Sequence, residues 1–314
     1  MDSALPYNDY GTAMRHRLGG RAQKLAIDAR LGCPNRDGTL ATGGCTFCLN
    51  EAFSPSYSRI YEGITQQIDH AIAFHLSRGR KADRYLAYFQ SGSNTHAPVE
   101  QLERLYHEAL SHPAIEGIIV GTRPDTISSE KLDLLEHISH SHYVAVEYGI
   151  ESTSDATLRH VNRHHTFATA REAVRLTAER QIDVGAHFII GLPNEDEELI
   201  IGSIADINSL GLNTIKFHQL QLYRGTPMAE EYHLHPERFM LRDYTPERYI
   251  DLLIAILRHL DSSIAVERLF TMAPRHLILH SPLGGIKPDI LHQMLISRMA
   301  TVAAYQGDRL TLGK

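Results

Sequence analysis

A regular alternation of short apolar segments with longer amphipathic ones constrains this chain most. The apolar segments read as strands at residues 24–29, 84–90, 115–122, 143–150, 184–190 and 214–221. Segments with helical periodicity follow the first five of them, at residues 62–78, 99–110, 128–138, 167–180 and 195–210. The alternation predicts right-handed crossovers and a parallel sheet. Six units are too few for a closed eightfold barrel, so we expect an α/β fold, a partial parallel (β/α)6 TIM-like barrel.

The pattern changes after about residue 235. We expect helices at 246–259 and 286–304, with a short strand at 265–270 between them. The chain therefore divides into a partial-barrel domain, residues 1–235, and a C-terminal α-rich extension, residues 236–314. Ligands of parallel α/β sheets bind at the carboxyl ends of the strands, and the unusual polar clusters of this sequence fall at such ends.

Composition excludes several classes of protein. The 314 residues contain no run of about 18 apolar residues, so we expect no membrane span. The N-terminus lacks a basic head followed by an apolar stretch, so we expect no secretory signal and a cytoplasmic location. The formal net charge is −6. Locally the sign reverses in one short stretch that contains Arg15, Arg17, Arg21, Lys24, Arg30 and Arg36.

All three cysteines of the chain, Cys33, Cys45 and Cys48, lie in the loop after the first predicted strand. An odd number of cysteines without a secretory signal argues against a disulfide framework. Three thiolates can bind three irons of a cubane cluster and leave the fourth iron open to a small molecule. A structural zinc site needs four ligands, so one of the twenty histidines would have to join them. The number of thiolates and their position favour the cluster.

The cysteine loop, with Cys33-Pro34-Asn35-Arg36-Asp37-Gly38 and Gly43-Gly44-Cys45-Thr46-Phe47-Cys48, resembles the YhcC-type radical S-adenosylmethionine (SAM) proteins. This group is related to the radical SAM domain of the elongator catalytic subunit, which acts on tRNA. Eleven residues separate the first two cysteines, where the commonest radical SAM spacing has three. The chain also lacks tryptophan, which close relatives would be expected to carry near residues 271–283.

The resemblance implies a 4Fe-4S cluster on the three cysteines and SAM beside it. Gln90 and Asn94 lie where the superfamily binds the SAM amino group, although a turn-forming role is the rival interpretation for Asn94. Glu151, followed by Ser152, is expected to accept hydrogen bonds from the SAM ribose, and Arg163 to pair with the SAM carboxylate. Gly191 opens the turn expected to support the adenine. The rival interpretations are a solvated strand end for Glu151 and a helix cap for Arg163.

The chemistry implied is reductive cleavage of SAM to a 5′-deoxyadenosyl radical, which abstracts hydrogen from a substrate. The elongator likeness implies a tRNA uridine side chain as substrate, and an electron donor such as flavodoxin or ferredoxin as partner. If RNA is bound, the basic stretch containing Arg15, Arg17 and Arg21 has to fold back toward the barrel mouth to contact phosphates. The alternatives are a radical SAM enzyme acting on a small metabolite and a zinc-stabilised binding protein. No protein side chain is assigned as catalytic.

Overall fold

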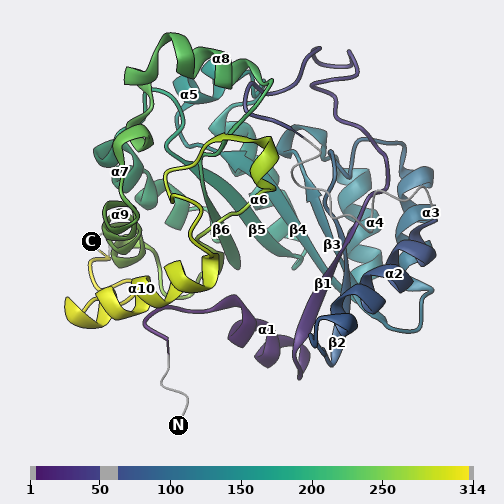
Figure 1. Ribbon diagram of the computed structural model, residues 1–314. Helices are drawn as coiled ribbons and strands as arrows, with labels where there is room; N and C mark the ends of the chain where they lie inside the picture. Colours follow the sequence, from purple (N-terminus) through teal and green to yellow (C-terminus); the bar gives the residue numbers. More distant parts are fainter. Residues whose placement is uncertain (1–4, 50–62, 311–314) are drawn as a thin grey trace.

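The computed structural model describes residues 5–49 and 63–310 (Figure 1). Its main sheet has seven parallel strands in the order β1-β2-β3-β4-β5-β6-β8. Their bounds are β1 Ala22–Ile27, β2 Arg84–Phe89, β3 Ile115–Thr122, β4 Tyr143–Glu151, β5 Asp183–Ile190, β6 Thr214–Gln219 and β8 Ala265–Arg268. The six strands of the partial barrel are confirmed, and the C-terminal segment adds a seventh.

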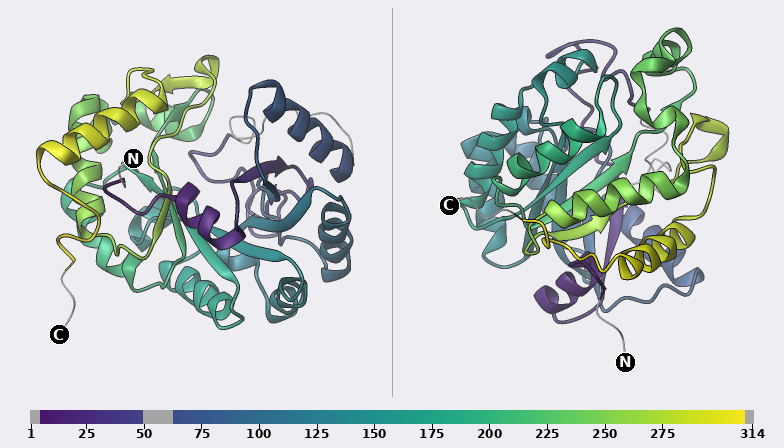
Figure 2. Two further views of the ribbon diagram at one scale, coloured as in Figure 1. Left: turned by 90° about the horizontal axis from the view of Figure 1, so that it is seen from below. Right: turned by 90° about the vertical axis from the view of Figure 1, so that its left-hand side faces the viewer.

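Helices cover the outer face of the curved sheet (Figure 2). They are α2 Ile64–Ser77, α3 Val99–Leu110, α4 Ser129–Ser139, α6 Phe167–Ala178 and α7 Glu197–Asn208, with the short α5 Asp155–His160 after β4. The predicted start of the first of these, at residue 62, lies outside the described residues. Side-chain hydroxyl or carboxylate caps begin several of these helices, as Ser128 does for α4 and Asp196 for α7.

Alternation along the strands separates two environments. In β6, Ile215 and Phe217 point outward into the main apolar core, whereas Lys216 and His218 point into the concave side. In β4, Val146 likewise packs outward and Glu147 faces inward. The concave face is therefore polar in its middle, where most barrels of this kind are filled by apolar side chains.

The sheet is not closed: β1 and β8 are its outermost strands, and the backbone of Asn8 and Asp9 bridges to Val266 of β8. Helix α1 Tyr10–Leu18 crosses the lower end of the opening and packs Met14 against Leu86, Tyr88, Ile119 and Ala145 (Figure 2, left). Higher up, a Lys24–Glu267 ion pair joins the two edge strands, with 2.5 Å between Nζ and Oε2. Side chains close the gap that backbone hydrogen bonds leave open.

The basic stretch before β1 lies at the opposite end of the barrel from the cysteine loop (Figure 1). Arg17 pairs with Asp183, the first residue of β5, at 2.8 Å. Gly19 ends α1 in the left-handed conformation, at φ 70°, and β1 starts three residues later at Ala22. The expectation that Arg15, Arg17 and Arg21 fold back to the mouth is therefore wrong. The short connection cannot cross the roughly 20 Å length of a six-residue strand.

The C-terminal part packs beside β6. It contains α8 Pro227–Leu234, α9 Pro246–His259 and α10 Pro288–Thr301, and a small antiparallel pair of β7 Leu222–Tyr223 with β9 Ile278–His280. Helix α9 lies between α7 and α10. The boundary at residue 235 stays a prediction, since β8 of the extension joins the main sheet. None of the helices within 5–49 and 63–310 has the length and apolarity that crossing a membrane requires.

Candidate functional site

A cavity opens at the carboxyl ends of the strands, on the concave side of the sheet. Cys33, Cys45 and Cys48 all line it, and none of them is in a disulfide within the described residues. The loop that carries them is fixed by its own backbone: Arg36 N donates to Cys33 O at 2.8 Å, and Cys48 N donates to Cys45 O at 3.0 Å. Gly44 has φ 83°, and a Cβ there would lie 2.8 Å from Arg36 Nε. Only glycine fits this turn, so the sequence shapes the loop as well as supplying the thiols.

Hydrogen-bond donors surround the sulfur of Cys45. Asn35, which is fully buried, donates from Nδ2 to Cys45 Sγ at 3.3 Å. Arg163 lies on the other side, with Nη1 3.6 Å from the same sulfur. Both side chains therefore direct N–H groups at this sulfur. Burial, and after it the nearby Cys45, raise the pKa of the Cys48 thiol. A bound cation would offset the cost of bringing these sulfurs together as thiolates.

The thiol arrangement suits a cluster better than a single metal ion. A tetrahedral zinc ion needs four ligands around one point. Within residues 5–49 and 63–310, no three or more His, Cys, Asp and Glu side chains converge on one point as metal ligands. A cubane cluster makes no such demand, because each thiolate binds a different iron atom. Three cysteines around one cavity, with donors aimed at a sulfur, therefore fit a 4Fe-4S cluster.

Two further predicted residues form an ion pair in the same cavity. Arg163 Nη2 lies 3.3 Å from Glu151 Oε1, and it also donates to the carbonyl of Gly149. Burial by itself lowers the pKa of the Arg163 guanidinium, but Cys45 and Glu151 outweigh it and raise that pKa. Glu151 adopts φ 75°, a conformation that is rare for a non-glycine residue and clusters at functional sites. Gln90, half-buried, lines the cavity beside them.

Buried polar atoms at this mouth lack partners in the described part of the chain. They are Arg163 Nε, Arg123 Nη1 and Asn35 Oδ1. Arg123 is held in place by a two-pronged contact with Asp125, at 2.9 Å for both bonds, and by Arg163 O at 2.7 Å. Buried polar groups are normally hydrogen-bonded, so a group of unpartnered ones indicates a ligand.

Three predicted SAM contacts do not line this cavity, and their roles stay predictions. Asn94 is fully buried and donates from Nδ2 to Gly121 O at 2.8 Å. Ser152 donates to Glu195 Oε1 at 2.6 Å. Gly191 packs against Leu241, where a Cβ would come within 2.4 Å of Leu241 Cγ. Each lies behind the mouth, where it shapes the backbone that carries the lining residues.

Sequence reasoning missed a charged layer at the bottom of the cavity. Glu147 Oε1 pairs with Lys24 and Oε2 with Lys216, both at 2.5 Å, and His187 Nε2 lies 2.9 Å from Oε2. Glu267 pairs with the same two lysines, at 2.5 and 3.1 Å. Burial by itself raises the pKa of Glu147, but Lys216 and Lys24 outweigh it and hold that pKa well below its usual range. We call Lys24, Glu147, Lys216 and Glu267 the charged quartet.

The sequence did contain a signal for this layer. Lys216 and His218 alternate with Ile215 and Phe217 in a strand whose outer face is covered. Polar residues at every second position of such a strand indicate a polar interior. The partner strands could not be read the same way, because the quartet joins four strands that lie far apart in sequence.

Comparison with known proteins agrees with this site. Residues 32–207 match the Radical SAM superfamily, and residues 212–300 match the Radical_SAM C-terminal domain. The chain is 33% identical to protein YhcC of Escherichia coli K12 over 273 residues, which cover 87% of this chain and 85% of YhcC. It is 31% identical to protein YtqA of Bacillus subtilis over 303 residues, covering 96% and 92% of the two chains.

A solved structure shares the fold. The archaeal Elp3 of Methanocaldococcus infernus superposes with a TM-score of 0.65 at 14% sequence identity. The match covers 91% of this chain and 64% of that protein. Identity this low shows the fold alone, so the cysteine loop and the cavity beside it are weighed on their own geometry.

Proposed function

We propose, from the premise that this chain belongs to the radical SAM superfamily, that Cys33, Cys45 and Cys48 hold its cluster and that the adjoining cavity binds SAM. Membership makes the chain a radical SAM enzyme, with a 4Fe-4S cluster and SAM as its cofactors. The observation that carries the assignment is that the three cysteines of one loop line one cavity together with the Glu151–Arg163 pair.

The bound cofactors supply reductive cleavage of SAM to methionine and a 5′-deoxyadenosyl radical, which removes a hydrogen atom from the substrate. The protein's part is to bind, orient and exclude water. Asn35 and Arg163 hold the Cys45 sulfur in place through the contacts at 3.3 and 3.6 Å. The loop backbone holds the three sulfurs around one cavity.

For SAM itself we assign roles by position and chemistry. Glu151 accepts hydrogen bonds from ribose hydroxyls, and Gln90 offers an amide to the amino acid end. Arg163, whose Nε lacks a partner within the described residues, pairs with the carboxylate through its guanidinium fork. Asn94, Ser152 and Gly191 support these groups from behind the cavity wall.

The reaction requires one electron from outside, so we propose an electron donor such as flavodoxin or ferredoxin. We also propose a cytoplasmic location, where cysteines stay reduced until the cluster is assembled.

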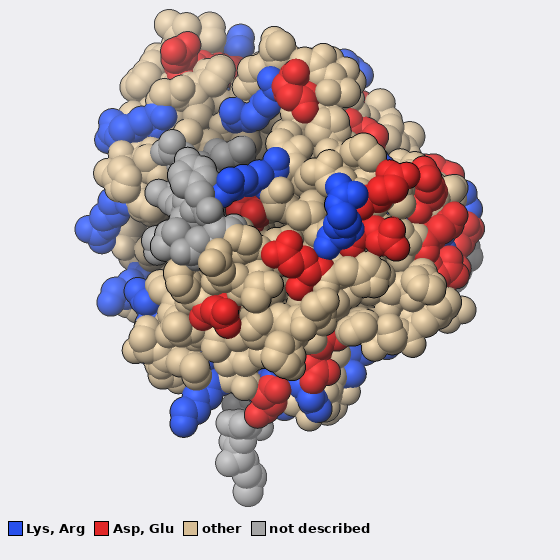
Figure 3. Space-filling view, turned by 90° about the vertical axis from the view of Figure 1, so that its right-hand side faces the viewer, with Lys and Arg blue, Asp and Glu red and all other residues tan. Residues whose placement is uncertain are grey.

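For the substrate we favour a small metabolite over a tRNA uridine. The tRNA alternative rests on the likeness to the elongator catalytic subunit. The part of its basic stretch that precedes β1, however, lies at the far end of the barrel from the cysteines (Figure 1), and of the later residues in that stretch Arg36 lines the cavity. On the side shown in Figure 3, the basic side chains of the described residues are scattered and the acidic ones gather in one region, which does not favour binding of a polyanion there.

Anaerobic reconstitution tests the proposal. The protein purified without oxygen should take up four irons and four sulfides per chain, show broad visible absorbance and convert SAM to methionine and 5′-deoxyadenosine with a chemical reductant. Stoichiometric zinc without visible absorbance would instead establish the zinc-stabilised binding protein. A cluster that neither binds nor cleaves SAM would also count against the proposal.

A further inference from the structure

The two sides of the cavity are formed by different elements of the fold and carry different side chains. The cysteines, Glu151 and Arg163 come from β4 and the loops after β1 and α5, whereas the opposite side comes from β6, β8 and the segment after it. The second side belongs to residues 212–300, the C-terminal domain match. It has no role in the cofactor assignments above.

The segment after β8 is fixed rigidly against the end of β6. Thr271 N donates to Gln219 Oε1 at 2.8 Å, and Gln221 Nε2 donates to Thr271 O at 2.9 Å. His218 Nδ1 lies 2.5 Å from Thr271 Oγ1. Side chains at the end of β6 and just after it thus hold the segment that follows β8, which preorganises a wall beside Arg268.

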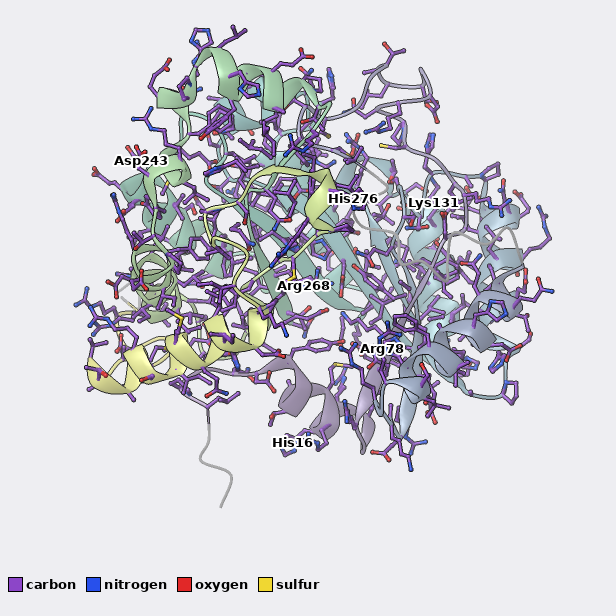
Figure 4. All side chains as sticks on the ribbon, in the orientation of Figure 1. His16, Arg78, Lys131, Asp243, Arg268 and His276 are labelled. Atoms are coloured by element: carbon purple, nitrogen blue, oxygen red, sulfur yellow. The ribbon has the colours of Figure 1, made fainter. Side chains whose placement is uncertain are left out.

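Arg268 is the exception on this wall. It lies near the middle of the molecule in Figure 4 and lines the cavity with an exposed side chain. Among the described residues it has no hydrogen-bond or ion-pair partner, although it lies close enough to act electrostatically on Lys216 and His218. Of the other Lys and Arg side chains that line the cavity, Arg123 pairs with Asp125, Arg163 with Glu151 and Lys216 with Glu147, and Arg36 donates to the carbonyl of Cys48.

The balance of charges at this end of the cavity indicates what kind of ligand group would pair with Arg268. The charged quartet balances two lysines against two glutamates, so Arg268 leaves this end of the cavity with one positive charge in excess. The quartet cannot supply a carboxylate, because both glutamates already accept from two lysines. When a substrate displaces water from the cavity, Arg268 loses its hydration, which is costly unless the ligand brings a counter-charge.

We propose that Arg268 binds an oxyanion of the substrate, a carboxylate or phosphate group on a small molecule, and so orients it against the SAM side. A guanidinium presents its donors as a planar fork that fits both groups. This subsite rests on the proposed function, because it defines the substrate half of the same cavity. It predicts an acidic substrate held between Arg268 and the cofactor side.

Calorimetry on the reconstituted, SAM-loaded enzyme tests the subsite with two probes, succinate and inorganic phosphate, at one fixed ionic strength. Wild type should bind one of them, and the preferred probe identifies the class of oxyanion. Arg268→Gln should weaken that binding by about tenfold or more, because a charge-assisted contact is lost. Arg275→Gln, an exposed arginine that does not line the cavity, is the matched control and should bind like wild type.

Three outcomes would overturn the subsite: neither probe binds to wild type, R268Q binds like wild type, or R268Q loses affinity for SAM. The last would place the guanidinium on the SAM carboxylate. If R268Q does not fold, Arg268→Lys keeps the charge without the fork and should bind the probe more weakly than wild type. Failure of wild type itself to bind SAM would refute the proposed function instead, so the two failures are separable.

Discussion

Charged and polar side chains line both the bottom of the cavity, which we call the floor, and its mouth. Those of the floor are paired with one another, whereas several of those at the mouth have polar atoms without a partner among the described residues. On the floor, each member of the charged quartet has oppositely charged partners on two other strands. At the mouth, Arg163 Nε, Arg123 Nη1 and Asn35 Oδ1 have no partner in the described part of the chain, and Glu151 has an unfavourable φ. Saturated charges indicate a structural role, whereas unsatisfied groups on a strained backbone indicate a ligand. Variants of the two regions should therefore fail differently.

The largest expected effect is at the mouth. Cys45→Ala, and equally Cys33→Ala or Cys48→Ala, should abolish cluster assembly and SAM cleavage, because three thiolates are the minimum for this site. The apoprotein should stay folded, since the loop is held by backbone hydrogen bonds. Iron content, visible absorbance and 5′-deoxyadenosine release measure the result. Thr39→Ala, an exposed position in the same loop, is the control. A single cysteine variant with full iron and activity would contradict the assignment.

Next comes the floor, where Lys216→Met should destabilise the fold by about 3–5 kcal/mol, the usual cost of breaking a buried ion pair. Both Lys216 and Glu147 are only 3% exposed, so water cannot compensate the charge left behind. Urea unfolding of the protein without cofactors reads this directly. Arg298→Met breaks an exposed pair with Asp251 and should unfold close to wild type. Equal unfolding midpoints for the two variants would mean that the quartet does not hold the barrel edges together.

Glu195 lies behind the mouth and should make the stability of the fold depend on pH. Burial raises its pKa to about 7, in spite of hydrogen bonds from Ser152, Thr157 and Leu192. In the unfolded chain the carboxyl ionises at an ordinary pKa near 4.3. Between these values the unfolded state loses its proton first, so stability falls as pH rises and reaches a plateau above about pH 7. The full loss is on the order of 3 kcal/mol.

Glu195→Gln should remove this dependence, because the amide oxygen still accepts from Ser152 while no charge develops. The variant should match wild type near about pH 4.5 and exceed it at about pH 8 by the same order of magnitude. Urea unfolding across that range measures the difference. Glu198→Gln, an exposed neighbour on the first turn of α7, is the control and should leave the profile of wild type. Parallel curves for E195Q and wild type would show that Glu195 is not held neutral.

A smaller effect is expected from Glu151→Gln, which should weaken SAM binding by roughly 1.5–3 kcal/mol, the worth of a hydrogen bond to a charged group. Iron content should change less than SAM affinity, since Glu151 is not a cluster ligand. Calorimetry on the reconstituted enzyme measures it, with the exposed Glu130→Gln as control. An unchanged SAM affinity would remove Glu151 from the site.

The sequence predicted the features that depend on residues close together in the chain, and not those that depend on contacts between distant strands. Periodicity gave the six strands and their helices, because outward residues such as Val146 and Phe217 must be apolar at every second position. The cysteine motif located the site because its residues lie close in sequence. Asn94, Ser152 and Gly191 were located by motif too, but a motif does not give side-chain direction. The charged quartet was not predicted, because its ion pairs depend on how distant strands are aligned in the sheet. In addition, β8 has only four residues, too few to show a clear alternation of polar and apolar positions.

The smallest effect on SAM cleavage is expected from the arginines at the end of the barrel opposite the cysteines. Replacing Arg15, Arg17 and Arg21 together by Ala should leave SAM cleavage unchanged, because these residues lie a strand's length from the cysteines. Arg17 is 57% exposed, and its contact with Asp183 is open to water and salt.

If the substrate is small, wild type should show no tRNA affinity at physiological salt, and the triple variant should not differ. If wild type instead binds tRNA, and the triple variant lowers the salt dependence by about 0.9 log units per lost contact, RNA binds at this end. Since a strand's length then separates that RNA face from the cluster, such a result would require a uridine to reach around the barrel edge. It would count against a small substrate, whereas a flat titration with the cluster intact would count against tRNA.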